Sequence, residues 1–207
     1  MWYAIVVSAL VSYLLGNLNG AVCISALMHD DVRTHGSGNA GLTNFIRNYG
    51  NARALYVVAI DAGKAFLACL AAGLMLEPYG LGLEGRVLGG VCVMLGHDFP
   101  ALLGFKGGKG ILSGWFVAWA VDWRIGLLIA VVFFGAYLLT RYVSLGSVLA
   151  AVAFGVGFVL LHGGKPLVML GGLLMGALTV FMHRTNIVRL LKGQEKKTHL
   201  FRANKNQ

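Results

Sequence analysis

Two lysines and three glycines fall within six positions in the stretch FKGGKG, residues 105–110. Glycine leaves backbone N–H groups unshielded, so they can approach phosphate oxygens, and lysine supplies positive charge. The stretch differs from a P-loop, because Lys109 is followed by glycine instead of Ser or Thr and both flanks are apolar. We interpret it as an anion-binding loop, with an ordinary flexible loop carrying surface lysines as the alternative. The predicted binding residues are Lys106, Gly107, Gly108, Lys109 and Gly110.

A second polar segment, HGSGNAGLTNFIRNYG, covers residues 35–50. It combines turn-forming glycines with short polar side chains. Thr43 and Arg47 are four residues apart and would share one face of a helix. The pattern resembles an anion cradle at the start of a helix, and a capped surface loop is the alternative. The candidate residues are Ser37, Gly38, Asn39, Thr43, Asn44 and Arg47.

A third polar segment, HRTNIVRLLKGQEKK, covers residues 183–197 and follows the last apolar run. We interpret His183 and Asn186 as functional, because both fall where that run reaches the interface. The residues around Arg189 favour a short amphipathic helix lying on the membrane. Glu195 is the only acid in this tail, so we expect it to organise nearby cations, while the later lysines attract anionic lipid.

Four further titratable residues lie within or beside apolar runs. Asp61 and Lys64 are spaced i, i+3 and can neutralise each other, which leaves structural pairing and support of an active site both open. His97 is interpreted as structural. Arg141, at the end of an apolar run, is a candidate for contact with a headgroup or a phosphate.

The composition is that of an integral membrane protein. Of the 207 residues 57% are hydrophobic and only 12% are charged, with a mean hydropathy of +0.74. A soluble domain cannot hide that much apolar surface. We expect one domain over residues 1–207, all-α, as a polytopic helix bundle. The first apolar run has no preceding basic region, so we expect it to be a retained helix.

Seven apolar runs suggest about seven transmembrane helices, some of them short or broken. They are roughly 1–28, 54–76, 86–102, 110–121, 123–140, 143–162 and 166–182. The fourth run is too short to cross about 30 Å as an upright helix. Five spans with re-entrant pieces is therefore the alternative.

Charge predicts how the loops are sorted. The net charge is +9, and seven of the 17 Lys and Arg residues fall in the last 25 positions. Such a tail belongs in the cytoplasm and contacts membrane lipids; it lacks the interleaved aromatics typical of nucleic-acid binding. With seven spans, residues 29–53, 97–109, Arg141 and the tail share the cytoplasmic side. All three polar segments then face the same way.

The three segments together resemble the signature motifs of the bacterial acyl-phosphate:glycerol-3-phosphate acyltransferases. The resemblance rests on GSGNAGLTN followed by Arg47, on GHDFPALLGFKGGKG, and on HRTNIVRLLKGQE, in that order along nearly the whole chain. Leu42 departs from the alanine expected in the first motif. The resemblance implies a multi-spanning enzyme of the bacterial plasma membrane. It would move an acyl group from acyl phosphate to the 1-hydroxyl of sn-glycerol 3-phosphate, giving lysophosphatidic acid and phosphate.

The resemblance also implies roles for the candidate residues. The loop around Lys109 would bind glycerol 3-phosphate, and Ser37, Arg47, His183 and Asn186 would be catalytic. Either the leaving phosphate or His183 would take the hydroxyl proton. We expect direct transfer without an acyl-enzyme, because no cysteine lies in a polar segment. No cofactor or metal is expected. The alternatives are a small membrane anion transporter and a membrane scaffold, and the oligomeric state stays open.

Overall fold

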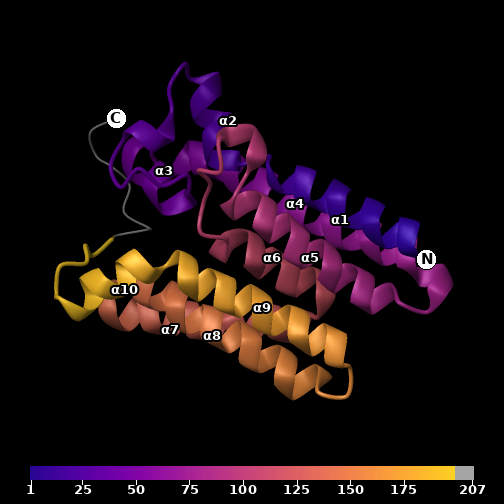
Figure 1. The fold of residues 1–207 in the computed structure, drawn as a ribbon. Coiled ribbons are helices and arrows are strands. Elements are labelled where there is room, and N and C mark those ends of the chain that lie inside the picture. Colours follow the sequence, from indigo (N-terminus) through magenta and orange to yellow (C-terminus); the bar gives the residue numbers. More distant parts are fainter. Residues whose placement is uncertain (199–207) are drawn as a thin grey trace.

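The computed structural model describes residues 1–198, so Arg202 and Lys205 of the basic tail lie outside the described residues. This part of the chain consists of helices joined by short loops (Figure 1). The α-helices are α1 (Trp2–Gly16), α2 (Gly20–Leu27), α3 (Leu42–Tyr49), α4 (Asn51–Leu76), α5 (Gly82–Asp98), α6 (Ile111–Val121), α7 (Trp123–Thr140), α8 (Val143–His162), α9 (Pro166–Met182) and α10 (Arg184–Leu191). Three single-turn 3₁₀ helices are η1 (Val32–Thr34), η2 (Glu77–Tyr79) and η3 (Ala101–Leu103).

Four of these elements are long and apolar enough to cross a membrane: α4 with η2, α5 with η3, α7 and α8. The number rises to six if α1–α2, bent by 44°, and α9–α10, bent by 56°, each count as one span. Helix α6 has 11 residues and rises about 16 Å, roughly half of an apolar bilayer core. The prediction of an all-helical membrane bundle with short and broken segments is confirmed.

The helices form two packed groups that meet along α5, α6 and α9. Helix α4 packs against α1 and α5, while α8 packs against α7 and α9 (Figure 1). Small residues permit the close contact between α4 and α5. A Cβ atom at Gly85 or Gly89 would lie 2.4 Å from the carbonyl oxygen of Ala72 or Ala68. The small-xxx-small spacing of GRVLG is therefore a packing feature, as its sequence pattern predicts.

The first apolar run is not one continuous helix, because α1 and α2 are separated by Asn17, Leu18 and Asn19. The side chain of Asn19 accepts a hydrogen bond from the N–H of Val22 and so caps α2. Its Nδ2 also donates to the carbonyl of Ala40 (3.0 Å). Local capping by a buried asparagine is what ends the first helix early.

The opened backbone at this break contacts two other parts of the chain. The N–H of Leu102 donates to Oδ1 of Asn17 (3.0 Å), and Nζ of Lys64 donates to the carbonyl of Leu18 (2.8 Å). Together with the bond to Ala40, these contacts connect the break to both glycine-bearing loops. Backbone polar groups freed within a membrane need such partners, and here the break obtains them from side chains and neighbouring loops.

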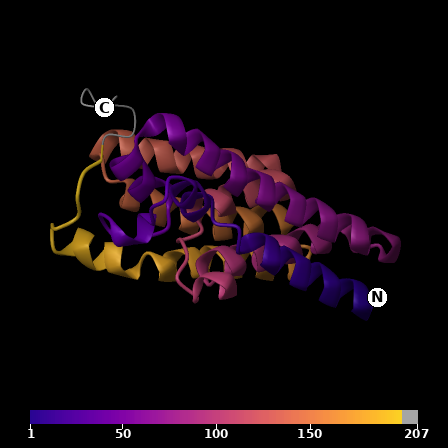
Figure 2. The ribbon, with the colours of Figure 1, turned by 90° about the horizontal axis from the view of Figure 1, so that it is seen from above.

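The loops sort to the two ends of the bundle as the charge pattern predicts. The side chain of Arg33 donates to the carbonyl of Leu103 (3.2 Å), and the N–H of Thr198 donates to the carbonyl of Arg141 (3.0 Å). His162 bonds Asp122 (3.1 Å) at the other end. Figures 1 and 2 both place α10 at the end away from the N-terminus. The three polar segments therefore share one end.

Candidate functional site

A cavity of about 340 Å³ lies at the end of the bundle that carries α3 and α10. Its lining has two parts, which come from different elements. Helices α6 and α7 and the start of α8 supply an apolar wall made of Ile111, Leu112, Trp115, Ile129, Ala130, Phe133, Phe134 and Val143. The polar wall includes Ser37, Asn39, Thr43, Asn44, Arg47, Lys109, Ser144, His183, Asn186, Arg189, Glu195 and Thr198.

The loop before α3 is shaped by a single buried carboxamide. Gly36 and Gly38 adopt left-handed φ values of 58° and 70°, which glycine tolerates best. Oδ1 of Asn44 accepts from the N–H of Ser37 (3.0 Å), and its Nδ2 donates to three carbonyls between Val32 and Asn39 at 3.0–3.1 Å. Asn44 is 2% exposed and fixes the loop that presents Ser37 to the cavity.

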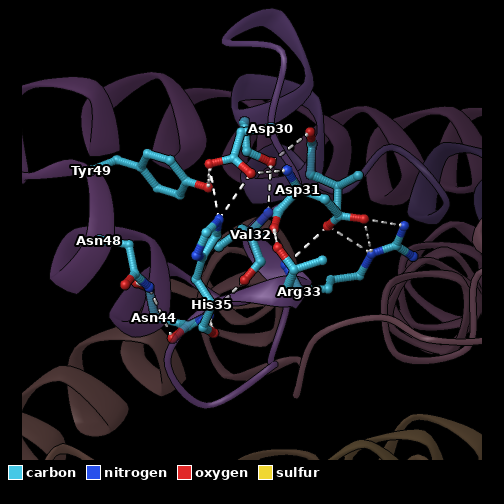
Figure 3. A network of polar contacts seen from close by, with 11 residues as sticks. Asp30, Asp31, Val32, Arg33, His35, Asn44, Asn48 and Tyr49 are labelled. Atoms are coloured by element: carbon cyan, nitrogen blue, oxygen red, sulfur yellow. Dashed lines mark hydrogen bonds and ion pairs between the residues drawn. The ribbon is translucent and has the colours of Figure 1, made fainter.

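Acidic residues upstream of this loop add a second set of contacts (Figure 3). The hydroxyl of Tyr49 donates to Asp30 (2.9 Å), and Nε2 of His35 bonds the same carboxylate (2.9 Å). Hydrogen bonds from His35 and Tyr49 hold the pKa of Asp30 below its ordinary value. Asp31 pairs with Arg33 (2.8 Å). The segment is tied down at both ends, so the loop is held in a defined shape.

The glycine-lysine loop folds back on the end of α5. The N–H of Gly108 donates to the carbonyl of His97 (3.1 Å). A Cβ at Gly107 would lie 2.0 Å from that carbonyl, and a Cβ at Gly108 would lie 2.1 Å from Nε2 of His97. Both positions therefore require glycine. They pack beneath the loop, while Lys109 and Gly110 line the cavity.

Lys109 is the cation that this loop delivers to the cavity. Its Nζ donates to Oδ1 of Asn186. Burial lowers the pKa of Lys109 to about 8, and the positive charge of Arg189 adds to the effect while Glu195 opposes it. The ammonium group therefore has cationic neighbours and one carboxylate close by.

His183 lies between α9 and α10 and is 4% exposed. Its Nδ1 is 2.8 Å from the carbonyl oxygen of Thr179. A carbonyl oxygen only accepts, so Nδ1 carries the proton and the neutral ring has its lone pair at Nε2. His183 thus presents a proton acceptor from the wall of the cavity.

The last turn of α10 is crossed by the following segment. Glu195 accepts from Nδ2 of Asn186 (2.8 Å) and from Nε of Arg189 (2.6 Å). Burial raises the pKa of Glu195, but its hydrogen bonds together with the positive charge of Arg189 outweigh burial and leave the pKa below the ordinary value. We call Lys109, Asn186, Arg189 and Glu195 the mouth cluster. It joins the second and third polar segments.

Arg47 reaches across the cavity to the end of the described chain. It lies one turn after Thr43 on α3, and its Nη2 donates to Oγ1 of Thr198. The backbone of Thr198 is held as well, because its N–H donates to the carbonyl of Arg141 (3.0 Å) and its carbonyl accepts from Tyr137 (3.1 Å). Three residues of the segment after α10, Glu195, Lys196 and Thr198, therefore form part of the cavity wall.

Deeper in the bundle lies a second polar group, which we call the inner cluster: Asp61, Lys64 and His97. Nζ of Lys64 lies 2.8 Å from Oδ1 of Asp61 and 2.7 Å from Nδ1 of His97. The three residues are 2–3% exposed. The carboxylate also accepts from the N–H of Gly20 (3.2 Å). Asp61 and His97 line the inner side of the cavity.

The predicted residues are thus mostly brought together, with some exceptions. Lys106 is exposed, and Arg141 contributes its carbonyl to Thr198 while its side chain is exposed. The residues predicted to bind substrate or act structurally that do not line the cavity are Gly38, Lys64, Lys106, Gly107, Gly108 and Arg141. Within residues 1–198 no group of His, Cys, Asp or Glu has the arrangement of a metal site.

Sequence reasoning missed several lining residues. Thr198 was included in the basic tail, whose lysines were assigned to lipid contact. Ser144 and the aromatic residues of α6 and α7 looked like ordinary members of apolar runs. The nearest signal for Ser144 was its position three residues after Arg141, at the start of a helix on the cationic side.

Fold and cavity together define a polytopic helical membrane protein with a cation-rich, partly apolar cavity at one end of its bundle. The model of the glycerol-3-phosphate acyltransferase family matches residues 6–193. A glycerol-3-phosphate acyltransferase of Thermoanaerobacter sp. (strain X514) is 36% identical over 196 residues, covering 93% of this chain and 94% of that protein. One of Clostridioides difficile (strain 630) is 34% identical over 197 residues, covering 94% of this chain and 96% of that protein.

Two solved structures of PlsY, an integral membrane glycerol 3-phosphate acyltransferase, share the fold. The glycerol 3-phosphate form is similar with a TM-score of 0.86 and 33% identity, covering 96% of this chain and 99% of that chain. The lysophosphatidic acid form is similar with a TM-score of 0.83 and 34% identity, covering 95% of this chain and 96% of that chain. The chain belongs to the glycerol-3-phosphate acyltransferase family. It is therefore a membrane acyltransferase rather than the transporter or scaffold that the sequence also allowed.

Proposed function

We propose that the protein transfers an acyl group from acyl phosphate to the 1-hydroxyl of sn-glycerol 3-phosphate. The products are 1-acyl-glycerol 3-phosphate (lysophosphatidic acid) and inorganic phosphate, in the first step of phospholipid biosynthesis. The reaction needs no cofactor and no metal, because acyl phosphate is already an activated mixed anhydride. Membrane lipids surround the enzyme and receive the product.

The observation that carries this proposal is the two-part lining of the cavity. The cavity is lined by four cationic side chains: Arg47, Lys109, Arg189 and Lys196. Two carboxylates also line it, but that of Asp61 is already paired with Lys64, which leaves the single carboxylate of Glu195. An excess of positive charge beside an apolar wall suits ligands that carry both a phosphate and an acyl chain. Both reactants carry a phosphate, and one of them also carries the chain.

The predicted residues divide the task between two anion positions. Lys109 and Asn186, with the loop that Gly107 and Gly108 shape, hold the phosphate of glycerol 3-phosphate. The segment with Ser37, Asn39, Thr43 and Arg47 surrounds the acyl-phosphate end and the negative charge that develops on the carbonyl oxygen. The acyl chain lies along α6 and α7, against residues such as Trp115 and Phe134.

The transfer itself balances without a covalent intermediate. The 1-hydroxyl oxygen attacks the acyl carbonyl carbon, the C–O bond to phosphate breaks, and phosphate leaves with the electron pair. The hydroxyl proton goes to the leaving phosphate or to Nε2 of His183, the unprotonated nitrogen of that ring. Holding the two reactants together supplies much of the acceleration, since the donor is activated. An acylated protein trapped with labelled acyl phosphate would contradict direct transfer.

We further infer that the cavity faces the cytoplasm across the bacterial plasma membrane. The end with the cavity carries Lys106, Arg141 and the basic tail, and cationic loops stay inside. A membrane-impermeant thiol reagent tests this with a cysteine in place of exposed Lys106, in a variant without the three native cysteines. Labelling only after the cells are opened is expected; labelling of intact spheroplasts would contradict the orientation.

The reaction is tested on the protein purified in detergent. Palmitoyl phosphate with glycerol 3-phosphate should give lysophosphatidic acid and free phosphate in equal amounts, while palmitoyl-CoA should give neither. Equal turnover with palmitoyl-CoA would overturn the choice of donor and leave the family intact. Arg47→Ala, at unchanged expression and elution volume, should lower turnover by at least about a hundredfold, the scale of losing a group that stabilises a transition-state charge.

A further inference from the structure

His97 was interpreted from sequence as structural, yet its ring has one nitrogen inside the inner cluster and the other toward the lysine loop. We propose that Nε2–H of His97 donates a hydrogen bond to the phosphate of glycerol 3-phosphate, next to the ammonium of Lys109. The inference rests on the proposed function, because it assigns one more residue to the same anion position.

The first step is the tautomer of the ring. Nδ1 of His97 lies 2.7 Å from Nζ of Lys64. A lysine ammonium group has only donors, so Nδ1 must accept. A neutral imidazole that accepts at Nδ1 has its proton at Nε2. His97 is therefore a donor at Nε2, the reverse of His183, whose Nδ1 donates to Thr179.

The second step is that Lys64 cannot turn away and release the ring. Its ammonium also lies 2.8 Å from Asp61 and 2.8 Å from the carbonyl of Leu18. The residue is 3% exposed, so bulk solvent has little access to these partners. Three separate acceptors, from α4, α5 and the α1–α2 break, fix the direction in which Lys64 donates to His97. The tautomer of His97 is fixed with it.

The third step concerns where Nε2 points. Among residues 1–198 Nε2 of His97 has no hydrogen-bond partner, although His97 is only 3% exposed. Nε2 is the ring atom nearest to Gly108, because a Cβ placed on that glycine would lie 2.1 Å from Nε2. His97 also lines the cavity. Nε2 is not among the fully enclosed side-chain atoms that lack a partner within residues 1–198, so it keeps a surface that a ligand can reach. A donor left open at the wall of a cavity is usually satisfied by a ligand or by water. Glycine at 108 keeps this direction free of side chain.

The chemistry of the partner follows from the surroundings. It must accept a hydrogen bond, and it must be drawn to a wall where cations exceed acids. The residue after Gly108 is Lys109, which lines the same cavity. A phosphate oxygen satisfies both requirements, whereas a hydroxyl or a carbonyl would leave the charge of Lys109 unmatched. The nearest phosphate in the proposed arrangement is that of glycerol 3-phosphate.

Two substitutions separate this role from a purely structural one. In His97→Asn, the side-chain oxygen stands near the position of Nδ1 and still accepts from Lys64, but no donor remains at the Nε2 position. In His97→Gln, the amide nitrogen stands near Nε2 and still donates, while the acceptor for Lys64 is lost. We expect the KM for glycerol 3-phosphate to rise about tenfold in His97→Asn, with kcat changed less than threefold, and to rise less than threefold in His97→Gln.

A structural role predicts the reverse order, with His97→Asn close to the original protein and His97→Gln impaired. That result overturns the proposal, and so does a KM raised equally in both variants. Thermal unfolding in detergent gives a second measurement. At one fixed concentration of glycerol 3-phosphate, close to the KM of the unsubstituted enzyme, the unfolding temperature should rise clearly more in His97→Gln than in His97→Asn, since the stabilisation by a ligand depends on how tightly it binds.

A measurement on the unsubstituted enzyme avoids any variant that fails to fold. With ¹⁵N-labelled histidine, the Nε2–H signal of His97, identified by its loss in His97→Gln, should move when glycerol 3-phosphate is added. A signal that stays in place at saturation overturns the proposal. If glycerol 3-phosphate neither acts as an acyl acceptor nor stabilises the unsubstituted protein, the proposed function itself fails, which is a separate outcome.

Discussion

The inner cluster and the mouth cluster use similar residue types in opposite ways. In the inner cluster Asp61 and Lys64 are matched one to one, and both come from the middle of a single helix, α4. In the mouth cluster two cations stand against one carboxylate, because Glu195 pairs with Arg189 while Lys109 bonds the amide of Asn186. The members come from a loop, a short helix and the segment after it. Arg189 is 42% exposed, whereas Lys64 is 2% exposed at its side chain.

We interpret the difference as one between charge that holds the fold and charge that the proposed function keeps for a ligand. A buried ion within a bilayer needs an equal and opposite partner, since it is otherwise strongly disfavoured. Charge that must bind an anion has to remain in excess and near water. The two histidines follow the same division, with His97 fixed by a lysine and His183 by a backbone carbonyl.

Removing one member of the inner pair should have the largest effect. Lys64→Met leaves the carboxylate of Asp61 buried without its cation, which costs on the order of 3–5 kcal/mol. We expect little folded protein after detergent extraction, measured by size-exclusion chromatography and thermal unfolding. Arg189→Met is the matched change in the mouth cluster and should cost less than about 1 kcal/mol, because its ion pair is partly exposed. Equal losses of stability would erase the distinction between the clusters.

Filling the space beside His97 should have the next largest effect. Gly108→Ala places a methyl group 2.1 Å from Nε2 of His97, so the loop must shift. A displacement near 1 Å in a reacting geometry reduces rates by roughly a hundredfold, and we expect that loss in kcat/KM for glycerol 3-phosphate. Gly135→Ala on α7 is the control, because a Cβ there meets nothing within 4 Å. A Gly108→Ala enzyme with normal kinetics would show that the loop is not held against His97.

The pH profile should report the excess charge of the mouth cluster. The pKa of Lys109 is lowered to about 8, so its ammonium form, which attracts phosphate, predominates below pH 8 and is lost above it. The value of kcat/KM for glycerol 3-phosphate, which reflects the free enzyme, should therefore fall by about tenfold between pH 7 and pH 9. Lys109→Arg remains charged and should lose this descending limb. An identical limb in both proteins would assign it to another group.

The smallest effect is expected at the end of the described chain. Thr198→Val removes the hydroxyl that accepts from Arg47 while keeping the side-chain shape. One hydrogen bond of this kind is worth about 1 kcal/mol, so kcat/KM should fall about fivefold with the unfolding temperature nearly unchanged. Thr198→Ser retains the hydroxyl and should restore activity. If serine and valine behave alike, Thr198 does not position Arg47.

Much of this arrangement can be predicted from the sequence. Some of the patterns are local, and others follow rules that apply to the whole chain. Apolar runs give the helices, and the bias of cations toward one set of loops brings the three polar segments together. The pairing of Asp61 and Lys64 follows from their spacing of three residues. These inferences succeed because helical periodicity and the cost of burying charge act wherever the residues occur.

The features that sequence reasoning does not predict depend on contacts between distant parts of the chain. The capping of α2 by Asn19 is local, but the bonds that join Asn17 to Leu102 and Asn19 to Ala40 reach later segments and have no local signal. Thr198 looks like any residue of a basic tail until Tyr137 and Arg47 are seen beside it. Which ring nitrogen of His97 carries the proton depends on Lys64, 33 residues earlier in the chain. Such features require the folded arrangement.

The three-residue interruption between α1 and α2 has a consequence for how this chain can change. Its asparagines hold the two glycine-bearing loops in register with one another, through Ala40 on one side and Leu102 on the other. One extra residue within α1 would turn these side chains by about 100° around the helix axis and break both attachments together, far from any substrate. The length of the first helix is thus as constrained as the identity of the residues proposed to bind phosphate, and insertions should be tolerated only at the opposite turns.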